Sequence, residues 1–204
     1  MNLLMINPVH PATAHISAVR AWRFSQELST FGHRVVLLTG PSPDGSTSSA
    51  EFDAHDWSAP FVLSCTTNAG SAVVATLGVP LRKLGTAWNM LSSGGTQGDW
   101  VRCAVKAVAR RAERFKPDLV WCTFGKMEAV FAAQRIAARE GCPWVLDIKD
   151  NWELYVPRGM RRLMAWRTRG WSAVTANAGF TADKARRWQR AQAEVVYSGV
   201  DDAF

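Results

Sequence analysis

Short apolar runs alternate with longer stretches of helical periodicity along this chain, and that alternation limits its fold more than any other feature. The first unit has an apolar run at 2–6, helical spacing at 16–31 and a second apolar run at 33–39. A strand, a helix and a strand in this order predict a βαβ unit with a right-handed crossover. Later apolar runs predict further strands at 61–65, 119–123, 143–148, 173–176 and 194–197.

Helical spacing between these strands predicts helices at 79–93, 99–116, 127–140, 158–171 and 181–192. Strands that alternate with helices are typical of a parallel sheet covered on both faces. We therefore predict an α/β fold: a Rossmann-like three-layer domain with a mostly parallel, doubly wound sheet of about seven strands. At 204 residues and 48% apolar content, the chain is long enough for one such domain, spanning 1–204.

Two helices show their expected core faces most clearly. In the first helix, the residues at helical spacing are Ile16, Val19, Trp22, Phe24, Leu28 and Phe31. In the helix at 99–116, the apolar positions are Val101, Val105, Val108, Ala112 and Phe115. The second helix also carries a basic stripe, which we expect to be solvated: Arg102, Lys106, Arg110 and Arg114.

Composition narrows the classes of partner and compartment. The net charge of +7 and the ten tryptophans favour anionic partners, namely phosphates, lipid headgroups or nucleic acid. Nucleic acid is the weakest of these, because the basic residues are spread over several helices without a recognition motif. The four cysteines stand far apart and form no C-x-x-C pair, so no metal site and no cofactor are expected. Since no apolar run is long enough to span a bilayer and no signal peptide opens the chain, we predict a cytoplasmic protein.

The stretch 143–152 holds the strongest functional candidates. An apolar strand opens at Pro143, and its charged end must leave the sheet. In open α/β sheets, ligands bind at the carboxyl ends of the strands. This places Asp147, Lys149, Asp150 and Trp152 where chemistry is expected. The alternative is structural: the carboxylates cap the next helix, pair with a nearby arginine, or pair with Lys149 and only fix the loop.

Other residues are expected at the same edge of the sheet. His10 and His15 lie in the loop before the first helix, and Thr123 and Lys126 lie where the fourth strand ends. These four are candidates for polar ligand contacts, although a loop histidine can be merely solvated. The first loop could present a helix N-terminus to a phosphate, but it has no glycine and so lacks a dinucleotide fingerprint.

Four motifs in a fixed order give the chain a family resemblance. They are Asn7-Pro8 through Trp22, the "GHxVxVxT" stretch at 32–39, the "KPDxV" stretch at 116–120, and 198–204, which is similar to "NGVDxxxF". Their order resembles the amino-terminal half of the family 4 glycosyltransferases. These are retaining enzymes of the GT-B type, with two Rossmann-like domains and an active site in the cleft between them.

Within that family, Asp147 to Trp152 resembles the "DxRDxW" variant of enzymes that build cell-surface polysaccharides. Three positions depart from the family pattern. Lys149 stands where many relatives carry histidine, Ala12-Thr13-Ala14 replaces a glycine pair, and Ser198 replaces the usual asparagine.

The resemblance implies the acceptor-binding domain of a transferase that moves a sugar from a nucleotide-sugar donor to a polysaccharide or lipid-linked acceptor. Lys149 and Asp150 would be catalytic, and the acceptor would contact His10, His15, Thr123, Lys126, Asp147 and Trp152. The donor would bind only with a second, carboxyl-terminal domain, which we expect to be absent from 1–204, so this chain alone is expected to be inactive. The alternative is a non-catalytic, Rossmann-like carbohydrate-binding or scaffold module.

The basic stretch at 158–171 suggests an anionic membrane as a further partner. Five arginines there surround methionine, leucine and tryptophan residues, and cations near an anionic bilayer attract it. This would place the protein peripherally at the inner face of the plasma membrane. A helix packed on the core with a solvated rim is the alternative.

Overall fold

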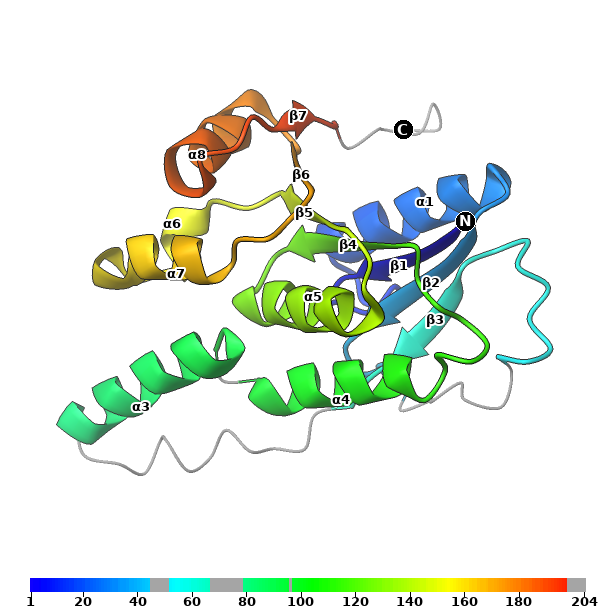
Figure 1. Cartoon of the computed structure of the whole chain (residues 1–204), viewed down its shortest axis with the longest axis horizontal. Coiled ribbons are helices and arrows are strands. Elements are labelled where there is room, and N and C mark those ends of the chain that lie inside the picture. Colours follow the sequence, from blue (N-terminus) through cyan, green and yellow to red (C-terminus); the bar gives the residue numbers. More distant parts are fainter. Residues whose placement is uncertain (45–51, 67–78, 96, 198–204) are drawn as a thin grey trace.

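The computed structural model describes residues 1–44, 52–66, 79–95 and 97–197. Within these residues, one sheet of seven strands has the order β3-β2-β1-β4-β5-β6-β7, and every neighbouring pair is parallel (Figure 1). The strands are β1 (Asn2–Ile6), β2 (Arg34–Thr39), β3 (Phe61–Ser64), β4 (Leu119–Phe124), β5 (Trp144–Ile148), β6 (Ala173–Ala176) and β7 (Glu194–Val195). The predicted doubly wound sheet is confirmed.

The helices complete three layers. They are α1 (Ile16–Thr30), α3 (Val79–Ser93), α4 (Gly98–Ala109), α5 (Met127–Glu140), α6 (Trp152–Tyr155), the 3-10 turn η1 (Arg158–Met160), α7 (Arg161–Arg167) and α8 (Gly179–Gln189). Figure 1 shows α1 on one face of the sheet and α4 and α5 on the other. All strands end at the same edge, which we call the carboxyl edge.

Three helices differ from their predicted extent. The helix expected at 99–116 ends at Ala109 and continues as turns, since Pro117 disfavours helical backbone before it and the chain must reverse to begin β4. The helix expected at 158–171 is split into η1 and α7, and Gly170, at φ +101°, follows its end. The single turn α6 was not predicted, because four residues carry no helical period.

The predicted core face of α1 is partly wrong. Ile16, Val19 and Phe31 are exposed. The face that packs on the sheet is instead a row of small residues with one arginine: Ser17, Ala18, Arg20, Ala21, Ser25 and Ser29. Small side chains let the helix backbone approach the sheet closely, while the larger Trp22, Phe24 and Leu28 pack beside β1 and β2.

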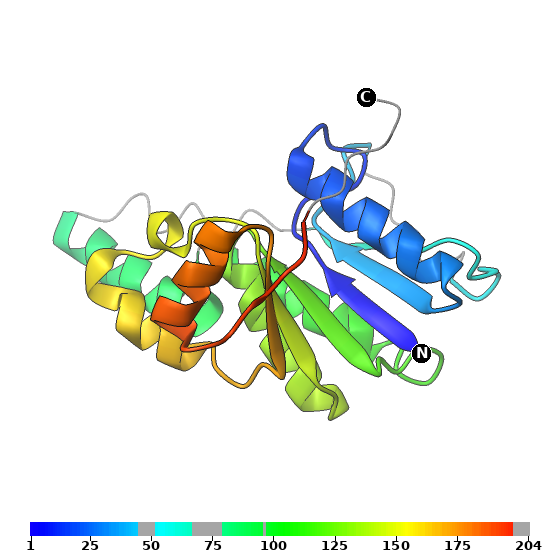
Figure 2. The same ribbon diagram turned by 90° about the horizontal axis from the view of Figure 1, so that it is seen from above.

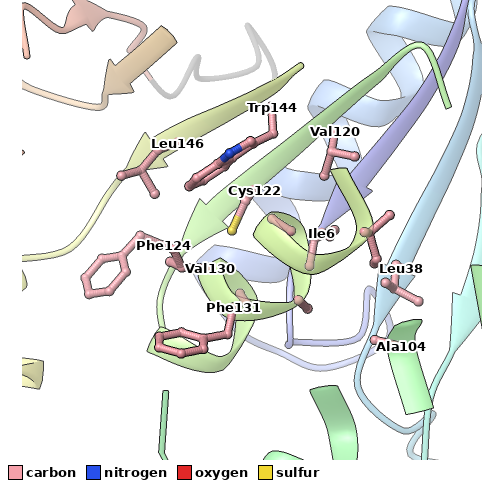
Figure 3. Packing of buried hydrophobic residues seen from close by; sticks show 14 of the residues in the cluster. Ile6, Leu38, Ala104, Val120, Cys122, Phe124, Val130, Phe131, Trp144 and Leu146 are labelled. Atoms are coloured by element: carbon pink, nitrogen blue, oxygen red, sulfur yellow. The ribbon is translucent and has the colours of Figure 1, made fainter. Parts of the chain in front are cut away.

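The core between the sheet and α5 holds the carboxyl edge in place. β5 is buried along its whole length, as expected for a central parallel strand. Phe124, at the end of β4, is fully buried and packs among the apolar residues of α5 and β5 that Figure 3 shows, including Val130, Phe131 and Leu146. The turn that follows Phe124 therefore starts from a rigid base.

Candidate active site

The loops after β4 and β5 meet at the carboxyl edge. Phe124 pairs with Ile148 in the sheet, so Gly125 and Lys149 leave it side by side. Lys149 donates a hydrogen bond from Nζ to Asp150 Oδ2 at 2.8 Å. Its side chain is 8% exposed, whereas that of Asp150 is 32% exposed. The two therefore form an ion pair whose carboxylate faces solvent more than its ammonium does.

Gly125 leaves room for this pair. A β-carbon at Gly125 would lie 3.3 Å from Lys149 Cε and 3.4 Å from Nζ, and 3.6 Å from Asp150 Oδ2. The lysine thus lies flat against the turn between β4 and α5. This close approach limits how far the ammonium can move.

Tyr155, on α6, lies next to Asp150. Burial and, next in size, the Asp150 carboxylate raise the pKa of Tyr155 above its usual value. The phenol therefore stays protonated near neutral pH and can act as a donor beside the ion pair. Sequence reasoning did not find Tyr155, because α6 itself was not predicted.

Two cavities share Lys126 in their linings. One, of about 240 Å³, is lined by the first loop, the turn after β2 and the start of α4, and its lining includes His10, Gly40, Gln97 and Trp100. The other, of about 220 Å³, is lined by Gly94, Gly95, Glu128 and Tyr155, among others. Each is smaller than the roughly 300–1,000 Å³ of a usual ligand pocket, so each suits one part of a larger ligand.

The two histidines of the first loop have different surroundings. His10 lines the first cavity, and its Nδ1 accepts a hydrogen bond from the Ala12 amide at 3.1 Å. Burial lowers the pKa of His10, opposed by the nearby Asp44, so the ring is neutral at pH 7 and offers Nε2–H as a donor. His15 is exposed and caps α1, since its Nδ1 accepts from the Ser17 amide at 3.0 Å.

Asp147 lies inside the protein instead of on the site surface. Its side chain is 0% exposed and its Oδ1 accepts from Arg20 at 3.1 Å and from Thr175 at 2.9 Å. Arg20 also donates to the Val196 carbonyl at 3.3 Å. Asp147 therefore ties α1 to β5, β6 and the segment after β7. An arginine partner was among the structural alternatives that the sequence left open.

Thr123 and Trp152 are also beneath the site. Both are buried, and the Trp152 ring packs on Phe124 with centroids 5.5 Å apart. Asn151 caps the α6 turn by accepting from the Glu153 amide at 3.0 Å. The structure thus places Asp150, His10 and Lys126 at accessible positions of the edge, with Lys149 largely buried beside Asp150, and it places Asp147, Thr123 and Trp152 behind them.

Arg20 was missed by sequence reasoning, although a signal was present. It lies in the row of small residues that spans the buried face of α1, and a single arginine in such a row must find a carboxylate. Among the described residues no three potential metal-ligating side chains cluster together. No helix in the described part of the chain is both long and apolar enough to cross a membrane.

Comparison with solved structures finds glycosyltransferases of the same fold. The enzyme from Rickettsia africae ESF-5 superposes with a TM-score of 0.54 at 13% identity, over 98% of this chain and 43% of that protein. CalG4, the calicheamicin glycosyltransferase, superposes with a TM-score of 0.50 at 13% identity, over 86% of this chain and 47% of that protein. The chain thus spans less than half the length of either protein, and identities this low establish the fold alone.

Sequence comparison is more informative about the family. Curated proteins give no match. The family model described as Glycosyltransferase Family 4 matches residues 17–204, which is nearly the whole chain. This match agrees with the motifs at 32–39 and 116–120 and with the Rossmann-like fold. The chain therefore belongs to Glycosyltransferase Family 4.

Proposed function

We propose that this domain forms the acceptor side of a retaining glycosyltransferase that uses a nucleotide-sugar donor. The observation that carries the proposal is the Lys149–Asp150 pair at the carboxyl edge, where Asp150 interacts with Tyr155, a residue that lines one of the two cavities. Ligands of open α/β sheets bind at this edge. Membership of Glycosyltransferase Family 4 indicates sugar transfer as the reaction, and the Lys149–Asp150 pair provides a charged group at the edge where ligands bind.

The chemistry of transfer explains why a lysine is useful there. As the bond between the anomeric carbon and the diphosphate oxygen breaks, negative charge grows on the diphosphate. A positioned ammonium with little solvent around it stabilises that charge more than water does. Asp150 keeps the Lys149 side chain in one place, and its carboxylate, which is 32% exposed, can accept a hydrogen bond from an acceptor hydroxyl.

We further propose that the donor is held together with a second domain and that the product belongs to an envelope polysaccharide or glycolipid. This is supported by the resemblance to two-domain family 4 enzymes and by the coverage of the structural relatives, since this chain spans less than half of each. No metal ion is required in this scheme, since Lys149 supplies the positive charge on this side of the cleft.

Substitution of the pair tests the proposal in an enzyme that carries this domain and a donor domain. Lys149→Ala and Asp150→Ala should each lower the rate of sugar transfer about tenfold or more, as for other groups that stabilise developing charge, with little change in Tm. Lys106→Ala is the matched control, because Lys106 is an exposed lysine on α4. Transfer at the parental rate by both pair variants would contradict the catalytic roles. Sugar binding without any transfer would favour a non-catalytic carbohydrate-binding module.

A second observation favours contact with an anionic membrane. On α7, Met164 and Ala165 face the core, but Leu163 is 44% and Trp166 is 61% exposed. Leu154, on the neighbouring α6, is 80% exposed. Exposed apolar side chains among arginines suit the headgroup region of a bilayer. We propose that this surface brings the domain to lipid-linked acceptors at the inner face of the plasma membrane.

Vesicle sedimentation tests this contact. The double variant Leu163→Ser/Trp166→Ser should lose binding to vesicles of equal parts phosphatidylcholine and phosphatidylglycerol at low salt. Phe31→Ser is the control, because Phe31, which directly follows the last residue of α1, is 74% exposed and lies in another region of the chain. Equal sedimentation with neutral and anionic vesicles would count against the proposed surface.

A further inference from the structure

The excess positive charge of the chain is concentrated in one stretch. Residues 158–190 contain nine of the 24 basic residues but only one of the 17 acidic residues, Asp183. The remainder has 15 basic and 16 acidic residues, so the whole excess belongs to this stretch. The basic residues are spread over several helices, as expected, but their excess over acidic residues lies in this stretch. The two longest helices of the stretch, α7 and α8, pack against each other (Figure 2).

A cavity of about 420 Å³ lies between these helices. It is lined by four arginines, one tryptophan and one alanine: Arg162, Arg169, Arg187, Arg190, Trp188 and Ala165. We call it the arginine pocket. It shares no lining residue with the two cavities at the carboxyl edge.

The arginine pocket lies away from the candidate active site. α8 begins just after the carboxyl end of β6, so its last residues lie toward the opposite edge of the sheet. Arg169 precedes the first residue of β6, and Arg190 follows the last residue of α8. Both arginines thus belong to connections on the amino side of the parallel strands.

Little negative charge in the described residues balances these arginines. Glu153 lies 3.5 Å from Arg187, but its Oε1 is also 3.1 Å from Lys184 and accepts from Trp188 Nε1 at 2.9 Å. For the side chains of Arg162, Arg169 and Arg190, no acceptor is found within 1–44, 52–66, 79–95 and 97–197. Guanidinium groups gathered around one cavity repel each other, and a bound anion relieves that repulsion.

The backbone at Arg190 adds an independent observation. This residue ends α8 with φ +56°, in the left-handed region where glycine or asparagine is usual. Arginine at this position bears a conformational cost that glycine would avoid. Arg190 lines the pocket despite this cost, which glycine in the same position would not bear.

We propose that the arginine pocket binds the phosphate group of a phosphate ester. Arginine matches phosphate because its planar fork donates two parallel hydrogen bonds to the phosphate oxygens. The Trp188 ring, fixed through Nε1 by Glu153, offers an apolar wall for the organic part of the ester. The phosphate can come from a soluble ester or from a phospholipid headgroup, and the site is independent of the sugar-transfer reaction.

A structural explanation competes with this site. Cations near a helix C-terminus stabilise the helix dipole, and Arg186, Arg187 and Arg190 all lie at the end of α8. That explanation predicts a lower Tm when Arg190 is replaced and no bound phosphate. The phosphate site predicts instead that phosphate binds and that replacing Arg190 weakens this binding.

Arg190→Gly separates the two explanations, because it removes the cation and also relieves the left-handed backbone. Isothermal titration at low salt would measure binding of glycerol 3-phosphate to the chain 1–204, and sedimentation would measure binding to vesicles of equal parts phosphatidylcholine and phosphatidylglycerol. We expect Arg190→Gly and Arg162→Gln each to weaken phosphate binding at least about fivefold, with an unchanged or higher Tm for Arg190→Gly. Arg186→Gln is the matched control, since Arg186 lies on the same helix, is paired with Asp183 at 3.3 Å and does not line the pocket.

The two phosphate sources give different results. Binding of glycerol 3-phosphate that survives Leu163→Ser/Trp166→Ser identifies a soluble ester as a ligand. Binding to anionic vesicles alone, lost in Arg190→Gly, identifies a headgroup. Absence of both kinds of binding, or an equal loss in Arg186→Gln and Arg190→Gly, would overturn the proposal, as would a lower Tm in Arg190→Gly with phosphate binding intact.

Discussion

The buried pair between Arg20 and Asp147 makes a quantitative prediction about stability. Its atoms are 3.1 Å apart, and the two side chains are 3% and 0% exposed. Asp147→Ala would remove this carboxylate from the buried guanidinium of Arg20, and breaking a buried ion pair in this way costs about 3–5 kcal/mol. The lost Thr175 hydrogen bond adds about 1 kcal/mol. A domain is stable by only about 5–15 kcal/mol, so this one change removes a large share.

Urea unfolding followed by tryptophan fluorescence measures this loss. With a slope of about 2 kcal/mol per molar urea, this loss should lower the midpoint of Asp147→Ala by roughly 2–3 M. The double variant Arg20→Met/Asp147→Leu should lose much less than Asp147→Ala, because it leaves no buried charge. A double-mutant cycle with Arg20→Met then gives the coupling between the two side chains.

The exposed pair of Arg186 and Asp183 is the control. Its atoms are 3.3 Å apart, but both side chains are about 70% exposed, so Asp183→Ala should change the stability by less than about 0.5 kcal/mol. The reasoning would be refuted if Asp147→Ala and Asp183→Ala had similar midpoints. An acceptor-binding role for Asp147 would also need a change in acceptor affinity at unchanged stability.

Two further predictions concern titrating groups. Because burial lowers the pKa of His10, the unfolded state takes up a proton at a higher pH than the folded state, so the free energy of unfolding should fall from about pH 7 to pH 5.5. In urea titrations at several pH values, His10→Gln should make this pH dependence weaker; an unchanged pH dependence would exclude His10 as its cause. Burial raises the thiol pKa of Cys65 and Cys122, so iodoacetamide at about pH 8 should modify both cysteines only after the protein unfolds. Mass spectrometry that detects rapid labelling of either cysteine in the native protein would contradict this.

The sheet could be predicted from the sequence because its information is local. A buried parallel strand is a short apolar run, and the runs at Asn2–Ile6 and Trp144–Ile148 show it directly. The apolar face of α1 could not be predicted by the same rule. Helical spacing assigns large apolar residues to the packed face of a helix. Because α1 lies close to β1 and β2, however, its packed face consists mostly of small residues, and Ile16 was placed on the wrong face.

The site was predictable in position but not in contacts. Strand ends mark the carboxyl edge, and the adjacent residues Lys149 and Asp150 could be expected to pair. Arg20, which pairs with Asp147, is 127 residues away in the chain, a separation that no local pattern reveals. Tyr155 reaches Asp150 only because α6 turns the chain back over the edge.

The strand order has a consequence for synthesis at the ribosome. β1 is made first but lies between β2 and β4. β4 ends at Phe124, about 85 residues after β2 ends at Thr39. At an elongation rate of about 5–20 residues per second, one edge of β1 waits roughly 4–17 s for its partner. An unpaired apolar strand edge is a template for other chains, so chaperone binding to the nascent chain during this interval should govern the yield of folded protein.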